Sequence, residues 1–190
     1  LLMGKILYPK RRVSGYVGFI LGTGTNASYV ERNANIGKTT IFDTAKSQVI
    51  NTESGDYSLF GRSDFDEILD ESTRNTGHYF AEKMVSGAFI GRLVAVVVNE
   101  AQSSGLIAEG VEPRLSTKHV NDFILDHRED GNPLFEISDR AEGMREDLFQ
   151  IIDVVLERAA KLVSIQLVAI LRKSGVSDNF SAPILLSIDG

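Results

Sequence analysis

The sequence predicts a mixed α/β fold in which a small sheet packs with long helices. Three observations predict it: strand-like segments crowd the N-terminal third, helical patterns dominate the middle, and a short apolar run closes the chain. A chain of 190 residues fits one domain, and we expect residues 1–190 to form it. Cysteine is absent, which excludes a disulfide framework, a Cys-ligated metal and a thiol nucleophile.

The strands are expected first at residues 15–21 (GYVGFIL), then at 26–31 and 47–52. Only a short glycine-rich turn separates the first two, so they should pair antiparallel. The last strand is expected at residues 183–189 (PILLSID), where the apolar run indicates a buried position.

Two helices carry start signals. Ser63 is a candidate N-cap with Asp66 at the third helical position, which is a capping-box pattern. Ser116 could cap a short helix that ends near residue 125. A long helix is expected over residues 141–173.

Residues 79–102 carry apolar side chains mostly at steps of three and four, as in a helix. Gly87 and Gly91 interrupt this pattern. They indicate either a break or a place where another backbone approaches closely.

Charge disfavours two classes of partner. The formal net charge is −6, the wrong sign for a protein that binds the phosphate backbone, so we expect no nucleic acid. The most apolar stretch, residues 148–171, keeps a polar stripe and predicts an amphipathic helix rather than a membrane span. The charges near residues 9–12 follow the first apolar run, the reverse of a signal peptide.

A glycine-rich turn, GTGTNA, begins at Gly22 and matches G-x-G-x-x-A, with Asp43 about 20 residues later, as in a dinucleotide site. That site needs a helix after the turn, and the residues here are strand-like. A hairpin whose backbone N–H groups and threonine hydroxyls cradle phosphate fits better. A plain hairpin remains the alternative. The candidate phosphate-binding residues are Gly22, Thr23, Gly24 and Thr25.

Two glutamates lie at the ends of expected elements. Glu53 follows a strand, and Glu71 ends a helix, where the helix dipole disfavours a carboxylate. With Asn26 they could form a polar floor for sugar hydroxyls, since amides and carboxylates supply donors and acceptors. Acidic residues at element ends are also commonly just solvated. The histidines, His78 and two others, show no metal-ligand spacing, and we expect no metal site.

Three segments taken together resemble the hexokinase family. Residues 16–31 (YVGFILGTGTNASYVE) are similar to its phosphate loop, and residues 50–61 (INTESGDYSLFG) to its Asn-x-Glu-x-Gly turn. Residues 65–93 resemble its run from Phe-Asp through Asp-Glu-x-Ser to Leu-Gly. The closing LLSIDG looks like the strand before a further phosphate contact.

This resemblance implies a ribonuclease H-like, actin-like ATPase fold, with this chain as the hexokinase large lobe. It implies that Asn26, Glu53 and Glu71 hold the hexose and that Thr23 lies by the transferred phosphate. The implied cofactors are ATP and Mg²⁺, the metal being bound through ATP, and the implied reaction is phosphorylation of a hexose to its 6-phosphate in the cytoplasm.

The chain departs from the family pattern near the sugar motifs. Ser54 stands where an aromatic residue is usual, Thr76 and His78 replace a Pro and a Lys, and Arg92 stands where an acid is common. These changes leave the implied sugar ligands in place and predict a less tightly built pocket.

The resemblance also places the general-base Asp before Leu1 and an adenosine motif after Gly190. We therefore expect a domain incomplete at both ends, partnered by the small lobe of the same polypeptide and inactive alone. Two alternatives remain open: a non-catalytic hexose-binding or regulatory module, and a kinase of this fold for another sugar.

Overall fold

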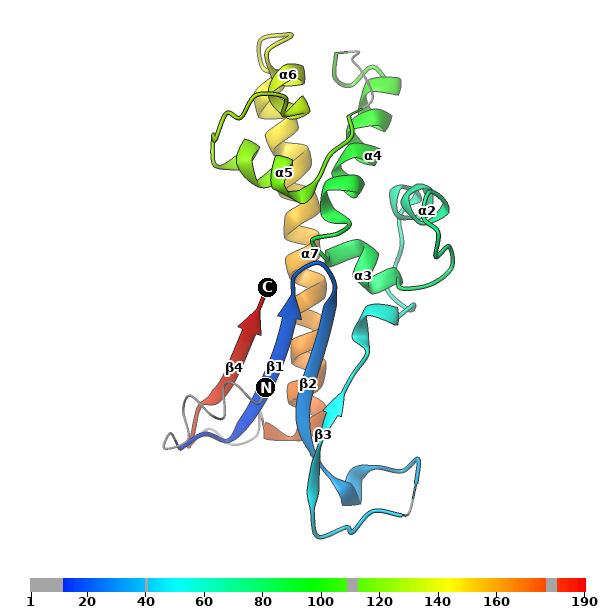
Figure 1. Ribbon diagram of the computed structural model, residues 1–190, viewed down its shortest axis with the longest axis vertical. Helices are drawn as coiled ribbons and strands as arrows, with labels where there is room; N and C mark the ends of the chain where they lie inside the picture. The colour runs from blue at the N-terminus through cyan, green and yellow to red at the C-terminus, as the bar shows by residue number, and fades with distance from the viewer. Residues whose placement is uncertain (1–11, 40, 109–112, 177–180) are drawn as a thin grey trace. The chain divides into compact units, whose positions relative to one another are not determined.

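The computed structural model describes residues 12–39, 41–108, 113–176 and 181–190 (Figure 1). The chain forms two compact units. Unit 1 comprises Leu1–Ser54 and Val163–Gly190, and unit 2 comprises Gly55–Leu162.

Unit 1 is built on a four-stranded sheet of order β3-β2-β1-β4 (Figure 1). Its strands are β1 (Gly15–Leu21), β2 (Thr25–Arg32), β3 (Ser47–Asn51) and β4 (Ile184–Asp189). β1 and β2 pair antiparallel, as predicted from the short turn, and β2 pairs antiparallel with β3. β4 returns from the far end of the chain to pair in parallel with β1. A short 3-10 helix, η1 (Asn33–Asn35), follows β2.

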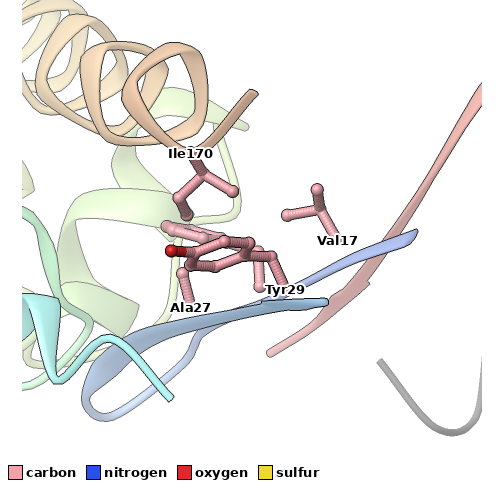
Figure 2. Close-up of a cluster of buried hydrophobic side chains, with 5 residues drawn as sticks. Val17, Ala27, Tyr29 and Ile170 are labelled. Carbon is pink, nitrogen blue, oxygen red and sulfur yellow. The ribbon is translucent and has the colours of Figure 1, made fainter. Parts of the chain in front are cut away.

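One face of this sheet packs on the C-terminal part of α7 (Met144–Ser174). Because side chains alternate along a strand, Val17, Ala27 and Tyr29 point to this face and bury themselves with Phe19 against Ile170. Figure 2 shows Ile170 lying over Ala27 and Tyr29. The other face carries the intervening residues of each strand.

The expectation that the last strand is buried is wrong, because every residue of β4 is half-buried or exposed. Leu186 is 42% exposed and Ile188 is 63% exposed. The register aligns them with Val17 and Phe19, so they point to the face that α7 covers. In the described part of the chain β4 pairs only with β1, and an edge strand keeps less cover than its neighbour.

Unit 2 is helical. It contains α2 (Asp64–Glu71), α3 (Phe80–Val85), α4 (Ile90–Ser103), α5 (Thr117–Ile124), α6 (Pro133–Ser138) and the start of α7, with a 3-10 turn, η2 (Ser54–Asp56), at its border. Both predicted N-caps are confirmed. The Ser63 hydroxyl accepts from the Asp66 N–H at 3.4 Å while the Asp66 carboxylate accepts from the Ser63 N–H at 2.7 Å. Ser116 caps α5 in the same way through His119.

The helical pattern of residues 79–102 is divided into α3 and α4 around Gly87. Gly91 is the site of a close approach, because a Cβ there would lie 2.2 Å from the carbonyl carbon of Ser116. The Thr117 hydroxyl accepts from the Gly91 N–H at 3.1 Å and donates to the Gly87 carbonyl at 2.6 Å. The predicted break is therefore at Gly87, and the predicted close approach of another backbone is at Gly91.

α6 was not predicted. The Asn132 side chain caps it by accepting from the Leu134 N–H at 3.1 Å, and Pro133 takes the first helical position, where its missing N–H costs nothing. The long helix starts at Met144, three residues later than expected, and ends where Gly175 adopts a φ of 68°. No helix among the described residues is long and apolar enough to cross a membrane.

Candidate functional site

The sugar and phosphate candidates of unit 1 gather at one end of its sheet. β1 and β4 run in parallel and both finish there, with Ile20 paired to Asp189. β2 begins at the same end, where Asn26 pairs with the same Ile20. The glycine-rich turn between β1 and β2 therefore lies beside Asn26.

Asn26 and Glu53 were predicted to share a sugar site although they lie 27 positions apart in the sequence, and the structure places them in contact. The Asn26 side-chain amide donates from Nδ2 to Glu53 Oε1 at 3.2 Å. The ladder explains the contact, because the register that pairs Ser28 with Asn51 continues as a hydrogen bond from Thr52 N–H to the Ala27 carbonyl and brings Glu53 opposite Asn26.

Asn26 is itself held in place. Its Oδ1 accepts from the Ala27 N–H at 2.7 Å and from the Thr52 hydroxyl at 3.4 Å. These bonds fix which side of the amide carries the Nδ2 donors. One Nδ2 hydrogen points to Glu53, and an amide nitrogen carries two.

The backbone of Glu53 is left-handed, with a φ of 51°. This conformation costs a residue with a Cβ about 1–2 kcal/mol. Such strain persists where the surrounding structure enforces it and concentrates at functional sites. The next residue, Ser54, has a buried hydroxyl without a hydrogen-bond partner among the described residues.

The GTG turn is a hairpin, as predicted, and β2 begins at Thr25 directly after it. A dinucleotide site would need a helix there, so the strand removes that alternative. Thr23 is exposed at the tip, while the Gly22 N–H is engaged with the Gly24 carbonyl at 3.0 Å. Thr25 is buried, and its hydroxyl donates to the Ile20 carbonyl at 3.2 Å, so this side chain supports the turn from within.

The end of β4 lies against this turn. A Cβ on Gly190 would lie 2.1 Å from the Leu21 carbonyl oxygen, and a Cβ on Gly22 would lie 3.5 Å from the Gly190 Cα. Two glycine backbones thus approach each other at the end of the sheet. A glycine-lined surface with a threonine hydroxyl suits a phosphate group, which needs close approach to backbone N–H groups.

The third predicted sugar residue, Glu71, belongs to unit 2. It is exposed and is the last residue of α2, the predicted place with an unfavourable helix dipole. Its neighbour Asp70 is buried and accepts from Lys83 Nζ at 2.5 Å. The part of Glu71 in sugar binding stays a prediction from the family resemblance.

Glu82 is a further acidic residue of unit 2 that the sequence analysis did not single out. It lies in the first turn of α3, the end where the helix dipole favours a negative charge, and it is half-buried. The turn before it is fixed, because the Tyr79 backbone has a φ of 56° and its N–H donates to the Asp56 carboxylate at 2.7 Å.

One departure from the family pattern, Arg92, takes a structural part in unit 2. Arg92 donates to the Ser72 hydroxyl at 3.1 Å and lies over the Phe89 ring. It also lines a groove of about 950 Å³ whose walls include Leu69, Ser72 and Leu115. His119 is part of a helix cap. The described residues contain no cluster of three or more His, Cys, Asp or Glu side chains arranged to hold a metal ion.

Comparison with known proteins identifies the family. The hexokinase family model matches residues 16–190. The chain belongs to the hexokinase family. It is 34% identical over 171 residues to Hexokinase-like 1 protein of Arabidopsis thaliana, covering 83% of this chain and 35% of that protein. It is 32% identical over 177 residues to Hexokinase-7 of Oryza sativa subsp. japonica, covering 84% of this chain and 38% of that protein.

A solved hexokinase from Schistosoma mansoni, in complex with glucose, superimposes with a TM-score of 0.77 at 25% identity, covering 98% of this chain and 44% of that chain. The fold is therefore the actin-like ATPase fold of hexokinases, as predicted. The chain spans little more than a third of the length of the curated relatives. Residues 1–5, which the sequence places just after the family's general-base segment, lie outside the described residues.

Proposed function

We propose that this hexokinase-family chain contributes the hexose-binding floor and a phosphate-binding turn to an ATP-dependent hexose kinase that forms hexose 6-phosphate. One observation carries the proposal. The hydrogen-bonded pair of Asn26 and Glu53 lies at the same end of the sheet as the Gly22–Gly24 turn. A sugar held by the pair would have a phosphate site next to it, which phosphoryl transfer requires.

The pair offers complementary groups to a sugar. Asn26 keeps one Nδ2 hydrogen as a donor, and the Glu53 carboxylate keeps Oε2 as an acceptor, since the contacts of its side chain within the described residues go to Oε1. One sugar hydroxyl can accept from the amide while its neighbour donates to the carboxylate. Two adjacent hydroxyls of a hexose ring match this arrangement.

The turn is proposed to receive the transferred phosphate. The Thr23 hydroxyl is exposed there, between two glycines whose backbone N–H groups carry no side chain beside them. ATP supplies the phosphoryl group, and the Mg²⁺ that accompanies it neutralises the phosphate charge. The chain's own task is to position these groups and exclude water. Because the chain matches only part of its relatives, turnover is proposed for the longer protein, in the cytoplasm.

The family resemblance proposes Glu71 of unit 2 as a further sugar ligand, and the half-buried Glu82 in the first turn of α3 is the alternative that the test below includes. The two make different predictions, because only the true ligand should weaken sugar binding when its charge is removed.

Saturation-transfer NMR on the purified chain tests the proposal, with glucose, mannose and ribose as ligands. We expect transfer to glucose, strongly reduced but still measurable in Glu53→Gln, and reduced in one of Glu71→Gln and Glu82→Gln. Glu157→Gln, at an exposed position on α7, is the matched control and should keep the signal. Equal transfer in wild type and Glu53→Gln would overturn the sugar assignment.

A nucleotide-binding experiment distinguishes a kinase from the alternative, a non-catalytic hexose-binding module. We expect saturation transfer from the chain to Mg·ATP, reduced by Thr23→Val, which keeps the shape of the side chain but removes its hydroxyl. Glucose transfer with no nucleotide transfer at millimolar concentrations would favour the binding module.

A further inference from the structure

We propose that Asn51 is a positioning residue for Glu53: together with Asn26 it occupies Oε1 of the carboxylate and leaves Oε2 as the atom that accepts from the sugar. This inference rests on the proposed function for its ligand. It adds a residue that touches no sugar itself and acts through Glu53.

The contacts converge on one oxygen. Asn26 Nδ2 donates to Glu53 Oε1 at 3.2 Å, and Asn51 Nδ2 donates to the same Oε1 in a closer contact. A carboxylate oxygen has two lone pairs, so two amide donors fill this one. The hydrogen bonds from the described residues thus treat the two oxygens of Glu53 differently.

The sheet register explains why both amides reach Glu53. Side chains alternate between faces, and Asn51 pairs with Ser28, two residues along β2 from Asn26. Asn26 and Asn51 therefore point to the same face, opposite the one that carries Tyr29 and Ile50 against α7. The left-handed turn at Glu53 begins two residues beyond Asn51 and directs its carboxylate back to this face.

Fixing the carboxylate matters because Glu53 is exposed. A free glutamate at the surface samples several rotamers, and ordering it on binding a ligand costs conformational entropy. Two neutral donors order it in advance without cancelling its charge, so the full negative charge is left for the ligand. A lysine at position 51 would hold the carboxylate as well but would compete for that charge.

The contact predicts a signature that needs no sugar. In a chain labelled with ¹⁵N-asparagine, Asn51→Ala and Asn26→Ala assign the two side-chain NH₂ signals. Glu53→Gln should then shift both signals, because both amides lose the same charged acceptor. Ser47→Ala, an exposed substitution on the same strand, is the control and should shift neither.

Sugar binding supplies the functional readout. Asn51→Ala should weaken glucose binding by about three- to tenfold, the range of a typical net hydrogen-bond contribution, because the lost bond orders Glu53 and does not touch the sugar. In a double-mutant cycle the same substitution should have no further effect in the Glu53→Gln background, because its influence passes through the carboxylate. The thermal midpoint should stay within the scatter of the Ser47→Ala control, since Asn51 is exposed.

Each result decides one of the two proposals. If the side-chain NH₂ signals of the asparagines do not shift in Glu53→Gln, the role of Asn51 is overturned, independently of the result for sugar binding. Equal losses from Asn51→Ala in the wild-type and Glu53→Gln backgrounds overturn it as well, because Asn51 would then act independently. If the wild-type chain gives no glucose transfer, the hexose proposal fails for this chain while the asparagine signals still decide the contact.

Discussion

Glu53 in unit 1 and Asp70 in unit 2 are both carboxylates held by several hydrogen bonds, and they are held by opposite means. Glu53 is exposed and receives two neutral amides on one oxygen. Asp70 is buried and receives the Lys83 ammonium at 2.5 Å and the Gly77 N–H at 2.9 Å. The Lys83 cation compensates the buried charge of Asp70 and so stabilises the fold. The donors on Glu53 are neutral, so its charge is not compensated by them.

Two glycines, one from each unit, also differ in their surroundings, namely in the space around the position that a Cβ would take. Gly91 of unit 2 has the backbone of Ser116 within 2.2 Å of where its Cβ would be, so its lack of a side chain serves packing. Gly22 of unit 1 has ordinary space, since a Cβ there would lie 3.5 Å from the Gly190 Cα, so packing does not require a glycine at this position. Residue types alone do not separate a structural position from a functional one; the surroundings do.

The largest expected effect comes from Lys83→Met, which leaves the Asp70 carboxylate buried without its cation. We expect a loss of about 3–5 kcal/mol in the free energy of unfolding, measured by urea denaturation. Lys161→Met, which removes an exposed helical pair with Glu157, is the control and should leave the midpoint almost unchanged. A small effect of Lys83→Met would mean that Asp70 reaches water and that the contrast with Glu53 is false.

Gly91→Ala against Gly22→Ala tests the second contrast. The new methyl at Gly91 collides with main chain and should destabilise the chain by about 1–3 kcal/mol. At Gly22 it should leave the thermal midpoint nearly unchanged while weakening transfer to Mg·ATP. Equal stability losses at both positions would remove the distinction between packing and access.

Acid pH should act on unit 2 through Asp66 and Asp70. Burial opposes ionisation of both, but the hydrogen bonds from Arg158 and Ser63 to Asp66, and from Lys83 and Gly77 to Asp70, outweigh it and hold each pKa below its usual value of 3.8. A lowered folded-state pKa gives stability that is fully present above the unfolded value and is lost as the pH falls through the folded one.

The free energy of unfolding should therefore fall as the pH drops below about 4. Asp66→Asn should be less stable at neutral pH and show a shallower fall, when unfolding is followed from pH 6 to pH 2. A fall of the same steepness in the variant would assign acid sensitivity to other carboxylates.

The smallest expected effect has the opposite sign. Glu53→Gly relieves the left-handed backbone and should raise stability by about 1 kcal/mol while abolishing transfer to glucose. Glu53→Gln keeps the strain and should leave stability close to that of wild type. A destabilised Glu53→Gly would show that the carboxylate supports the fold after all.

The parts of the fold that depend on local signals could be predicted. The capping box at Ser63, the antiparallel start and the hairpin at Gly22 depend on residues a few positions apart. The exposure of Ile188 could not be predicted, because alternation and apolar content are the same for an edge strand and a central one. The separate helix α6, which begins at Pro133, was missed because its Asn-Pro signal also marks a turn.

The candidate site divides in the same way. Residue types and family resemblance selected Asn26 and Glu53, and the register of β2 with β3 brought them together. The inward hydroxyl of Thr25 and the contact of Asn51 with Glu53 depend on which face each strand residue takes and on a positive φ. Those properties arise only when distant segments pair.

The Thr117 hydroxyl that accepts from Gly91 has a consequence for the order of folding. The N-cap residue of α4, Phe89, makes no side-chain cap hydrogen bond, and the Gly91 N–H in the first turn is instead satisfied by a side chain 26 positions after Gly91. An excised α4 peptide of 14 residues should be largely unstructured in water, since isolated helices of that length are marginal even for alanine-rich sequences. In the growing chain, the first turn of α4 should gain this hydrogen bond only after α5 has been synthesised and has docked.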